Sequence, residues 1–402
     1  MARAKKCRDY FKESKMLRPE FLPFHQPSID GEEIQEVVDT LKSGWITTGP
    51  KTKLFEKKFQ EYIGCKYAIA VSSCTAGLHL ALVAAGVGQG DEVITTPYTF
   101  ATTGEVIIQI GAKPVFVDIE EDGFNIDVTK IPEAITPETK AIIPVHFAGE
   151  PCDMDEIMKI AQENNLFVIE DAAHAVGAEY KGKKIGNIGD VTVFSFYATK
   201  NLTTGEGGMV TTNNDELAEK IRLLSLHGIS KDAWKRYTAE GSWYYEILYA
   251  GYKYNMTDIQ ASLGIHQLNK LEKFLSIRQK YAQRYSSAFA DISEIKTPPV
   301  NHHVRHAWHL YVIRLNSASL SIDRKQFIEA LKAENIGSSV HFIPLHLHPY
   351  YRNRYAYKLG DYPNAEDTYS RVISLPLFPK MTIADVEDVI KAVKKTVCIH
   401  ER

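Results

Sequence analysis

The sequence predicts an α/β fold, in which a mainly parallel sheet is flanked by helices and followed by a smaller α+β domain. Up to about residue 226, short apolar runs bounded by turn residues alternate with segments whose apolar side chains recur at helical spacing. This alternation is typical of a parallel sheet with helices on both faces. A long helical pattern over 258–285 then leads into a region with a different order of strands and helices. With 402 residues, the chain has room for one large and one smaller domain.

The elements of the first half follow from the apolar spacing. A helix is predicted over 30–41, with Ser28 or Asp30 as its cap, and a second helix over 54–62 ends near Gly64. Strands and helices then alternate. We expect strands at 67–71, 92–96, 114–117, 140–145, 166–169 and 191–196, and helices at 78–85, 99–110 and 154–164.

The second half begins with a strand at 209–212 and a helix at 215–226. An irregular segment rich in aromatic residues, 227–254, separates them from the long helix, and irregular segments of this length are often functional. Beyond the long helix we expect strands at 308–315, 339–342 and 373–377, and helices at 324–334, 364–371 and 383–397. The predicted parts are therefore an extension (1–20), a large domain (21–270) and a small domain (271–402).

The composition is that of a globular protein and argues against several functional classes. The net charge of −3 predicts neither a nucleic-acid partner nor an anionic membrane partner. Five scattered cysteines without a CxxC pair fit a reducing cytosol, and histidines between 302 and 348 lack a tight ligand spacing, so we expect no metal site. No apolar run has membrane-spanning length, and the basic amino terminus lacks the apolar core of a signal peptide. We therefore expect a cytoplasmic protein.

The stretch 166–208 carries the first candidate site residues. Asp171 and Lys200 each follow a predicted buried strand, and open α/β sheets bind ligands at the carboxyl ends of their strands. Pyridoxal phosphate needs a lysine for its Schiff base and an acid that faces its ring nitrogen. The two residues are candidates for these roles. The alternative is a strand-end aspartate that caps a turn and an ordinary surface lysine.

Two earlier segments add weaker signals. The turn 72–77 joins a strand to a helix, and free backbone N–H groups there make an anion site that would hold a phosphate on Thr75 and Ala76. Many α/β turns have this sequence character. Phe100 follows another strand end, where its ring can stack on a flat cofactor or belong to the core. The residues alone favour the core for Phe100.

Taken together, these segments resemble the sugar aminotransferases of the DegT/DnrJ family, which bind pyridoxal phosphate on the fold type I architecture. The resemblance runs from about residue 27 to residue 379, and all its motifs occur in the family's order and spacing. It implies a mainly parallel seven-stranded sheet. The segments that carry it are 72–77, 90–94, 170–174, 195–200, 205–208, 251–255 and 306–310.

The resemblance also implies a role for individual residues. Lys200 would carry the cofactor and Asp171 would face its ring nitrogen, while Phe100 would stack on one ring face, which reverses the interpretation as core. The other implied cofactor contacts are Ala173 on the second ring face, His174 near the phenolic oxygen, and Thr75, Ala76 and Ser195 at the phosphate. Asn255 would reach the cofactor phosphate of a neighbouring subunit, which implies a homodimer with shared active sites. We expect His341, His309 and Tyr252 to contact the substrate.

The implied reaction moves an amino group from L-glutamate to carbon 4 of a UDP-4-keto sugar in polysaccharide or lipopolysaccharide synthesis. Segments 144–149, 225–234 and 375–379 are similar to family members that act on a UDP-4-keto-pentose. The alternatives are a UDP- or dTDP-4-keto-6-deoxyhexose, with or without an N-acetyl group, and a regulatory protein that binds pyridoxal phosphate. A dehydratase of this family would have histidine in place of Lys200, and a serine hydrolase would need a G-x-S-x-G elbow.

The sequence departs from the family pattern in two places. Near relatives often have an arginine in the segment that matches 240–246, where this chain has none. Either Arg236 or Lys253 takes its place, or the contact with the diphosphate or with glutamate differs. Phe100 stands where a tryptophan is expected. We expect the segment 227–254 and the neighbouring chain to determine which sugar is accepted.

Overall fold

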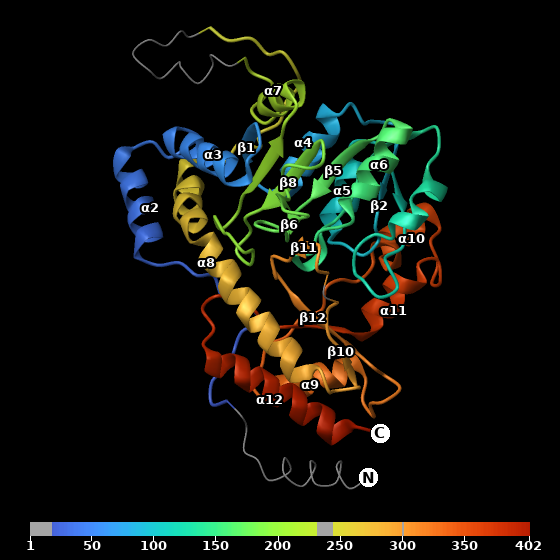
Figure 1. The fold of residues 1–402 in the computed structure, drawn as a ribbon. Helices are drawn as coiled ribbons and strands as arrows, with labels where there is room; N and C mark the ends of the chain where they lie inside the picture. Colours follow the sequence, from blue (N-terminus) through green and yellow to red (C-terminus); the bar gives the residue numbers. More distant parts are fainter. Residues whose placement is uncertain (1–17, 231–243, 300) are drawn as a thin grey trace.

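A seven-stranded sheet forms the centre of the larger part of the molecule (Figure 1). The computed structural model describes residues 18–230, 244–299 and 301–402. The prediction of seven strands is confirmed. In spatial order the strands are β1 (Tyr67–Val71), β9 (Gly208–Thr212), β8 (Val191–Ser195), β5 (Phe167–Asp171), β4 (Thr139–Ile143), β2 (Glu92–Thr95) and β3 (Lys113–Phe116).

The sheet is mainly parallel, as predicted. Neighbouring strands from β8 to β3 run parallel to one another, whereas β9 is antiparallel to both β8 and β1. A parallel connection needs a crossover of a dozen or more residues, usually with a helix. The connection from β8 to β9, residues 196–207, contains no helix, and it returns the chain in the opposite direction. Lys200 lies in this connection.

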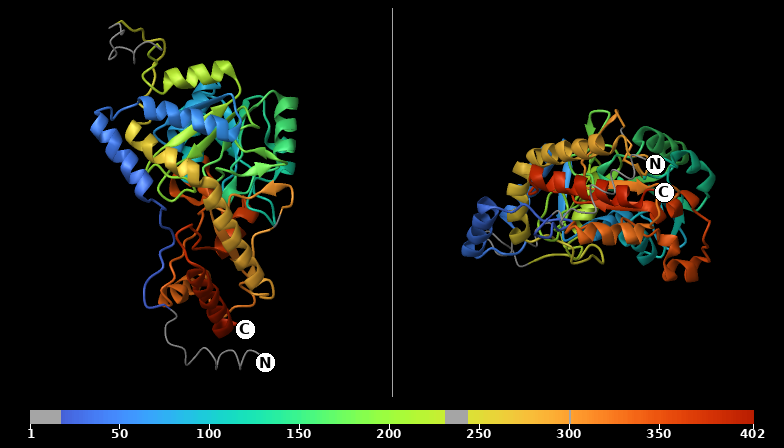
Figure 2. Two further views of the ribbon diagram at one scale, coloured as in Figure 1. Left: turned by 60° about the vertical axis from the view of Figure 1, so that its left-hand side comes forward. Right: turned by 90° about the horizontal axis from the view of Figure 1, so that it is seen from below.

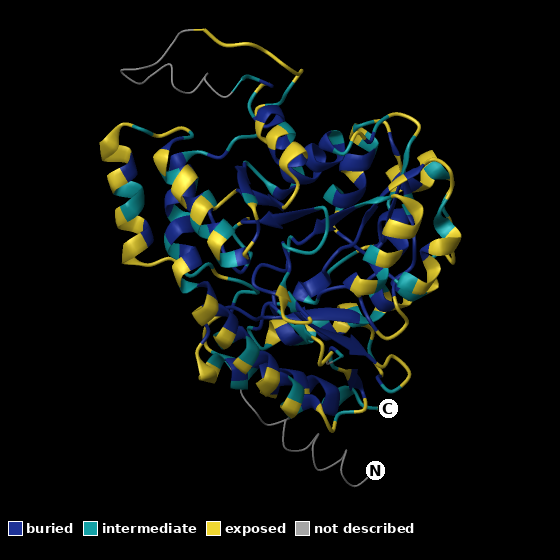
Figure 3. Cartoon of the chain, turned by 45° about the horizontal axis from the view of Figure 1, so that its top comes forward, coloured by how far each residue is buried: buried dark blue, intermediate teal, exposed yellow. Residues whose placement is uncertain are grey.

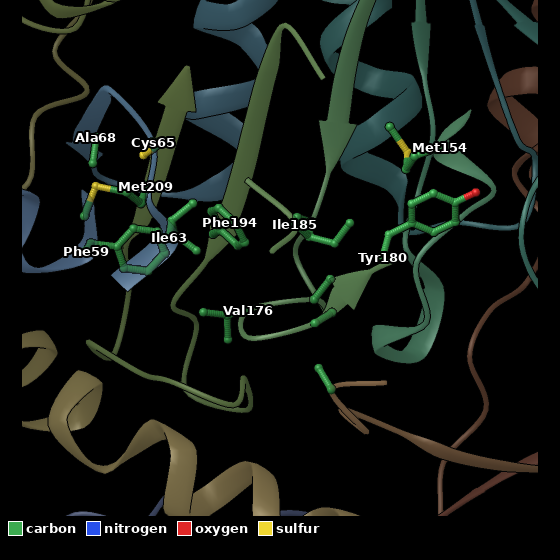
Figure 4. Packing of buried hydrophobic residues seen from close by; sticks show 14 of the residues in the cluster. Phe59, Ile63, Cys65, Ala68, Met154, Val176, Tyr180, Ile185, Phe194 and Met209 are labelled. Atoms are coloured by element: carbon green, nitrogen blue, oxygen red, sulfur yellow. The ribbon is translucent and has the colours of Figure 1, made fainter. Parts of the chain in front are cut away.

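Helices cover both faces of the sheet. Side chains that alternate along one strand enter different cores, as Val168 and Ile169 of β5 do. Figure 4 shows the first core around Phe59, Phe194 and Met209, and Figure 3 shows exposed residues on the outward faces of the covering helices. The helices of this part are α2 (Gly31–Ser43), α3 (Pro50–Ile63), α4 (Cys74–Ala84), α5 (Ala101–Gln109), α6 (Met154–Asn164) and α7 (Asp215–Leu224).

The carboxyl-terminal part is a smaller α+β unit that packs below the large sheet (Figures 1 and 2). Its sheet has the order β10-β12-β13. A further small sheet, β11-β6-β7, joins the two parts of the chain, since β6 and β7 follow β5 of the large sheet whereas β11 belongs to the carboxyl-terminal part. The remaining elements are β6 (Glu179–Tyr180), β7 (Lys183–Lys184), β10 (Ile295–Lys296), β11 (Val304–Arg305), β12 (Tyr311–Leu315), β13 (Val372–Leu375), α9 (Arg324–Ala333), α10 (Pro349–Tyr355), α11 (Pro363–Arg371) and α12 (Ile383–His400).

One long helix, α8 (Asp258–Phe289), connects the two parts. Its first half packs on α2 and α3, and its second half packs on α12. The predicted domain boundary at 270/271 falls inside this helix. The sequence of α8 contains no proline, and its glycine, Gly264, lies so close to the Phe55 ring that a Cβ would come within 2.6 Å of it.

Two expectations about elements need correction. Residues 339–342 do not form a strand, because only Ser339 pairs with Ser374 of β13 before the backbone turns away toward the large sheet. The helix α10 was not expected at all. Of the predicted extension, residues 18–20 are described, and Arg18 forms ion pairs with Asp385 and Asp388 of α12. Within the three described ranges, no helix is both long and apolar enough to cross a membrane.

Candidate active site

A cavity of about 450 Å³ lies where β5 and β8 end and the small domain begins. The large sheet and its helices provide one wall, and residues 339–342 and 375–377 of the small domain provide the opposite wall. Most of the residues predicted from the sequence line this single cavity. They are Thr75, Phe100, Asp171, Ala173, His174, Ser195, Lys200, His309 and His341.

Asp171 is the last residue of β5, and its carboxylate is buried. Burial raises the pKa of this carboxyl group, while two hydrogen bonds to its oxygens act in the opposite direction. The Thr103 hydroxyl donates to Oδ2 at 2.7 Å, and the Ala173 N–H donates to Oδ1 at 3.1 Å. The carboxylate therefore has a fixed orientation in the cavity wall.

Lys200 lies in the loop that follows β8, with its backbone N–H donating to the carbonyl of Tyr197 at 2.9 Å. Burial lowers the pKa of the Lys200 amine from 10.5 to about 8, and the nearby Asp171 charge partly opposes this change. A lysine with such a pKa loses its proton more readily than a surface lysine. It can therefore act as a nucleophile and as an acid or base near neutral pH.

The first turn of α4 provides hydroxyl groups at one end of the cavity. The Thr75 hydroxyl lies 3.1 Å from the Thr102 hydroxyl, and both residues line the cavity together with Ser73 and Ser195. Ala76 does not line the cavity, and its N–H donates to the Ser73 side chain, which caps the helix, at 3.0 Å. The hydroxyls and the positive end of the helix dipole suit a phosphate.

Phe100 presents its ring to the cavity instead of the core. The residue is 62% exposed, so the interpretation as a core residue, which the sequence alone favoured, is wrong. Its closest described ring neighbour is Phe342 of the small domain, with the ring centres 5.9 Å apart. Ala173 also lines the cavity. An open aromatic face of this kind fits a flat heterocyclic ring.

Histidines from both parts of the chain meet in the cavity. The ring centres of His174 and His309 are 4.3 Å apart, and His341 is held by a hydrogen bond of 2.8 Å between its Nδ1 and the Ser374 hydroxyl. Burial lowers the pKa of His174 and of His309 well below the ordinary value, and burial together with the Lys200 charge lowers the pKa of His341 to about 4. These imidazoles are therefore neutral at pH 7.

Besides Ala76, two predicted residues, Tyr252 and Asn255, lie outside this cavity. The Tyr252 ring stacks on Tyr254 at 5.1 Å and contacts the edge of His79. Asn255 donates to the Thr48 hydroxyl at 2.6 Å. Arg236 and most of the segment 240–246 lie outside the described residues.

The sequence analysis missed other lining residues, among them Phe24, His25, Tyr197 and Phe342. Phe24 and His25 precede the first predicted helix and carry no motif. Ser73 could have been found, because a serine before a helix of small residues is a common cap.

Comparison with known proteins identifies the family. The profile of the DegT/DnrJ/EryC1/StrS aminotransferase family matches residues 27–394. The chain belongs to this family. Among curated relatives, it is 64% identical to an uncharacterized protein, MJ1066, of Methanocaldococcus jannaschii, over 95% of this chain and 99% of that protein. It is 56% identical to the spore coat polysaccharide biosynthesis protein SpsC of Bacillus subtilis, over 94% and 98% of the two chains.

A solved member of the family has the same fold. The putative sugar aminotransferase Spr1654 of Streptococcus pneumoniae, in its PMP form, superimposes with a TM-score of 0.88 at 39% identity, covering 94% of this chain and 99% of that one. A PLP form of the same protein matches as well. The predicted fold type and the predicted cofactor are thereby confirmed: the protein is a sugar aminotransferase that depends on pyridoxal phosphate.

The residues of the cavity fit this cofactor. A buried carboxylate, an amine with a lowered pKa, an open aromatic ring and a hydroxyl-lined helix start lie around one space. These groups match the ring nitrogen, the aldehyde carbon, the ring face and the phosphate of pyridoxal phosphate, respectively.

Proposed function

We propose that this protein transfers the amino group of L-glutamate to carbon 4 of a UDP-4-keto-pentose. The observation that carries the proposal is the placement of Lys200 and Asp171 in one cavity between the large sheet and the small domain. The lowered pKa of Lys200 suits proton transfer near neutral pH. The pentose itself is supported by the resemblance of segments 144–149 and 375–379 to enzymes that aminate that sugar.

Lys200 and Asp171 would divide the chemistry between them. The bound cofactor supplies a ring that withdraws electrons from the reacting carbon. Asp171 keeps a proton on the ring nitrogen, and its fixed orientation means that it need not rearrange during the reaction. Lys200 takes the proton from the α-carbon of glutamate in the first half of the reaction. It would pass this proton to the cofactor, and in the second half it would carry a proton from the cofactor to carbon 4 of the sugar. Because glutamate leaves as 2-oxoglutarate before the sugar reacts, the kinetics should be ping-pong.

The remaining groups would position the cofactor. Thr75 and Ser195 hydrogen-bond the phosphate, while Phe100 and Ala173 lie on opposite faces of the ring. His174 accepts the N–H of Ala148 at its Nδ1, 3.2 Å away, so the proton of the neutral ring is on Nε2. This nitrogen can then donate to the phenolic oxygen of the cofactor.

The small-domain side of the cavity would receive the sugar. His309 and His341 are neutral, so each can donate a hydrogen bond to a sugar hydroxyl or accept one from it. A neutral imidazole also does not attract an anion. Apolar side chains of Leu375 and Leu377 line the same side. This combination suits an uncharged ring. The name of SpsC, a polysaccharide biosynthesis protein, supports a product that enters a polysaccharide.

A second copy of the chain would complete the site. Tyr252 and Asn255 lie outside the cavity of their own chain, next to an arm with exposed apolar side chains at Ile247, Leu248 and Tyr249. In a homodimer, this arm would be covered and Asn255 would reach the partner's cofactor phosphate. We place the enzyme in the cytoplasm, which fits its scattered cysteines.

A half-reaction experiment tests the proposed function. The purified protein loaded with pyridoxal phosphate is mixed with L-glutamate, and the cofactor absorbance band is followed. The band should fall with glutamate and return when UDP-4-keto-pentose is added. Return only with a UDP-4-keto-6-deoxyhexose or its N-acetylated form would replace the pentose with a hexose. If glutamate leaves the band unchanged, the proposed donor is wrong.

A further inference from the structure

Two threonine hydroxyls connect the Asp171 carboxylate to the wall of the cavity. Thr103 Oγ1 lies 2.7 Å from Asp171 Oδ2, and Thr99 Oγ1 lies 2.8 Å from Thr103 Oγ1. All three residues are buried, Thr103 completely. Thr99 lines the cavity, so the chain of hydroxyls runs from the cavity wall through Thr103 to the carboxylate.

The available hydroxyl protons determine which group donates and which accepts in each of these two hydrogen bonds. An ionised Asp171 can only accept hydrogen bonds, so Thr103 must use its one hydroxyl proton for Asp171 Oδ2. Thr99 must then donate to the Thr103 oxygen. Each donated bond polarises the next one, so the two hydroxyls stabilise the carboxylate charge together.

The placement of Thr103 differs from that of most helical threonines. It lies in the first turn of α5, whereas a threonine further along a helix commonly bonds its hydroxyl to a carbonyl of the preceding turn. Here the hydroxyl instead reaches a different element, β5, which is distant in sequence. The bond therefore links the start of α5 to the residue at the end of the strand.

We propose that Thr103 is a positioning residue that holds the Asp171 carboxylate toward the ring nitrogen of the cofactor, and that Thr99 orients the Thr103 hydroxyl. The inference rests on the proposed role of Asp171. Without the Thr103 hydroxyl, Oδ2 would lack this donor in a desolvated site.

Other groups also face this carboxyl. Burial raises the pKa of Asp171, whereas the charges of Lys200 and His146 lower it, and the buried Cys74 thiol lies near enough to interact with it. Removing the Thr103 hydroxyl would raise the pKa further, so the acid would be protonated more often at neutral pH. A protonated acid is a poor partner for a protonated ring nitrogen.

The test measures cofactor binding by variants of the full-length protein. Thr103→Val keeps the shape and removes the hydroxyl, and it should weaken pyridoxal phosphate binding about 10- to 100-fold, the worth of one hydrogen bond to a charged group. The pH titration of the bound cofactor's absorbance should move to higher pH, because the ring nitrogen holds less positive charge. Thr103→Ser restores the hydroxyl and should stay within about threefold of wild type.

Thr99→Val tests the second hydroxyl. It should weaken binding less than Thr103→Val does, and it should add little in the double variant if Thr99 acts through Thr103. Thr396→Val is the matched control, because Thr396 is a buried helical threonine in α12 whose hydroxyl bonds to its own helix, at the Ala392 carbonyl. This control should bind the cofactor as wild type does.

The proposal is overturned if Thr103→Val binds and titrates like wild type, or if Thr103→Ser is as impaired as Thr103→Val. If Thr103→Val does not fold, the cofactor affinity of Thr99→Val tests the proposal instead. An affinity equal to that of Thr396→Val would reject the proposed role of the two hydroxyls. Asp171→Asn separates this inference from the proposed function. If Asp171→Asn binds the cofactor as wild type does, the proposed role of Asp171 is wrong. If Asp171→Asn binds poorly and Thr103→Val binds normally, only the positioning role of Thr103 is wrong.

Discussion

The two walls of the cavity are built in different ways. On the large-sheet wall, Asp171 and Ser195 end strands of the central sheet, and Thr75 begins a helix. On the small-domain wall, His341 lies on irregular backbone that is paired to β13 only through Ser339. Regular hydrogen bonding fixes most of the first wall, although Lys200 lies in the loop that follows β8. On the second wall, a side-chain hydrogen bond to Ser374 holds His341.

This difference suggests a division of work. Groups that act on a bond must keep their positions within a fraction of an ångström, which is provided here by regular elements and, for Lys200, by a loop that is held between the strands β8 and β9. Groups that select a substrate can lie on irregular segments, which vary more readily among related proteins. We therefore expect substitutions on the large-sheet wall to affect catalysis and those on the small-domain wall to affect acceptor binding.

The largest expected effect is that of Lys200→Ala, on the large-sheet wall. The proposed roles of the Lys200 amine are the link to the cofactor and the transfer of the proton, so its removal should lower turnover by more than about 10⁴-fold. The absorbance of the protein with bound pyridoxal phosphate should also lose the band of the wild type. Absorbance spectra and steady-state kinetics measure these effects.

A matched control for this prediction is Lys280→Ala, which removes an exposed lysine from α8. It should keep the spectrum and the turnover of the wild type. If Lys200→Ala has the turnover of the wild type, the proposed catalytic role of Lys200 is wrong, and so is the expected functional difference between the two walls.

A smaller and different effect is expected from His341→Ala on the opposite wall. Loss of a hydrogen bond to the sugar should raise KM for the acceptor about tenfold and change kcat little. Cofactor affinity should stay unchanged, since His341 belongs to the sugar side. Initial rates at varied acceptor, together with a cofactor titration, check both parts. A loss of cofactor affinity with unchanged KM would show that the walls are not divided in this way.

The smallest effect concerns the stability of the cofactor-free protein. Burial lowers the pKa of Lys200 to about 8 from 10.5, so between these pH values the unfolded chain binds more protons at this residue than the folded chain does. The contribution of Lys200 to stability must therefore increase as pH rises from about 8 to 10.5. Lys200→Met should be more stable than wild type at pH 7, and urea unfolding should show this advantage shrinking through that window. An advantage independent of pH would mean that the amine is not desolvated.

Much of the large-sheet wall could be predicted from the sequence. Asp171 and Lys200 follow apolar runs that become β5 and β8, and parallel strands bring their carboxyl ends to one edge. Thr103 could not be predicted in the same way. It is a polar residue inside a helical pattern, and its bond to β5 depends on how α5 packs against the sheet.

Other differences between the sequence expectations and the structure have physical causes too. Residues 339–342 have the composition of a strand, but their backbone pairs with β13 only at Ser339. The N–H of Ala76 is taken by the Ser73 cap, which a strand–turn–helix pattern does not reveal. Tyr252 and Asn255 lie outside the cavity of their own chain, and the role proposed for Asn255 involves a second copy of the chain.

The unbroken helix α8 has a consequence for how substrates enter. Its 32 residues amount to about 48 Å of continuous helix, and sharp bends in helices need a proline, a glycine pair or a bulge. A straight helix that runs through both parts of the molecule resists a wide separation of the large sheet from the small domain at the cavity between them. We expect the proposed nucleotide sugar to enter from the side of the cavity instead, past the exposed rings of Phe100 and Tyr197.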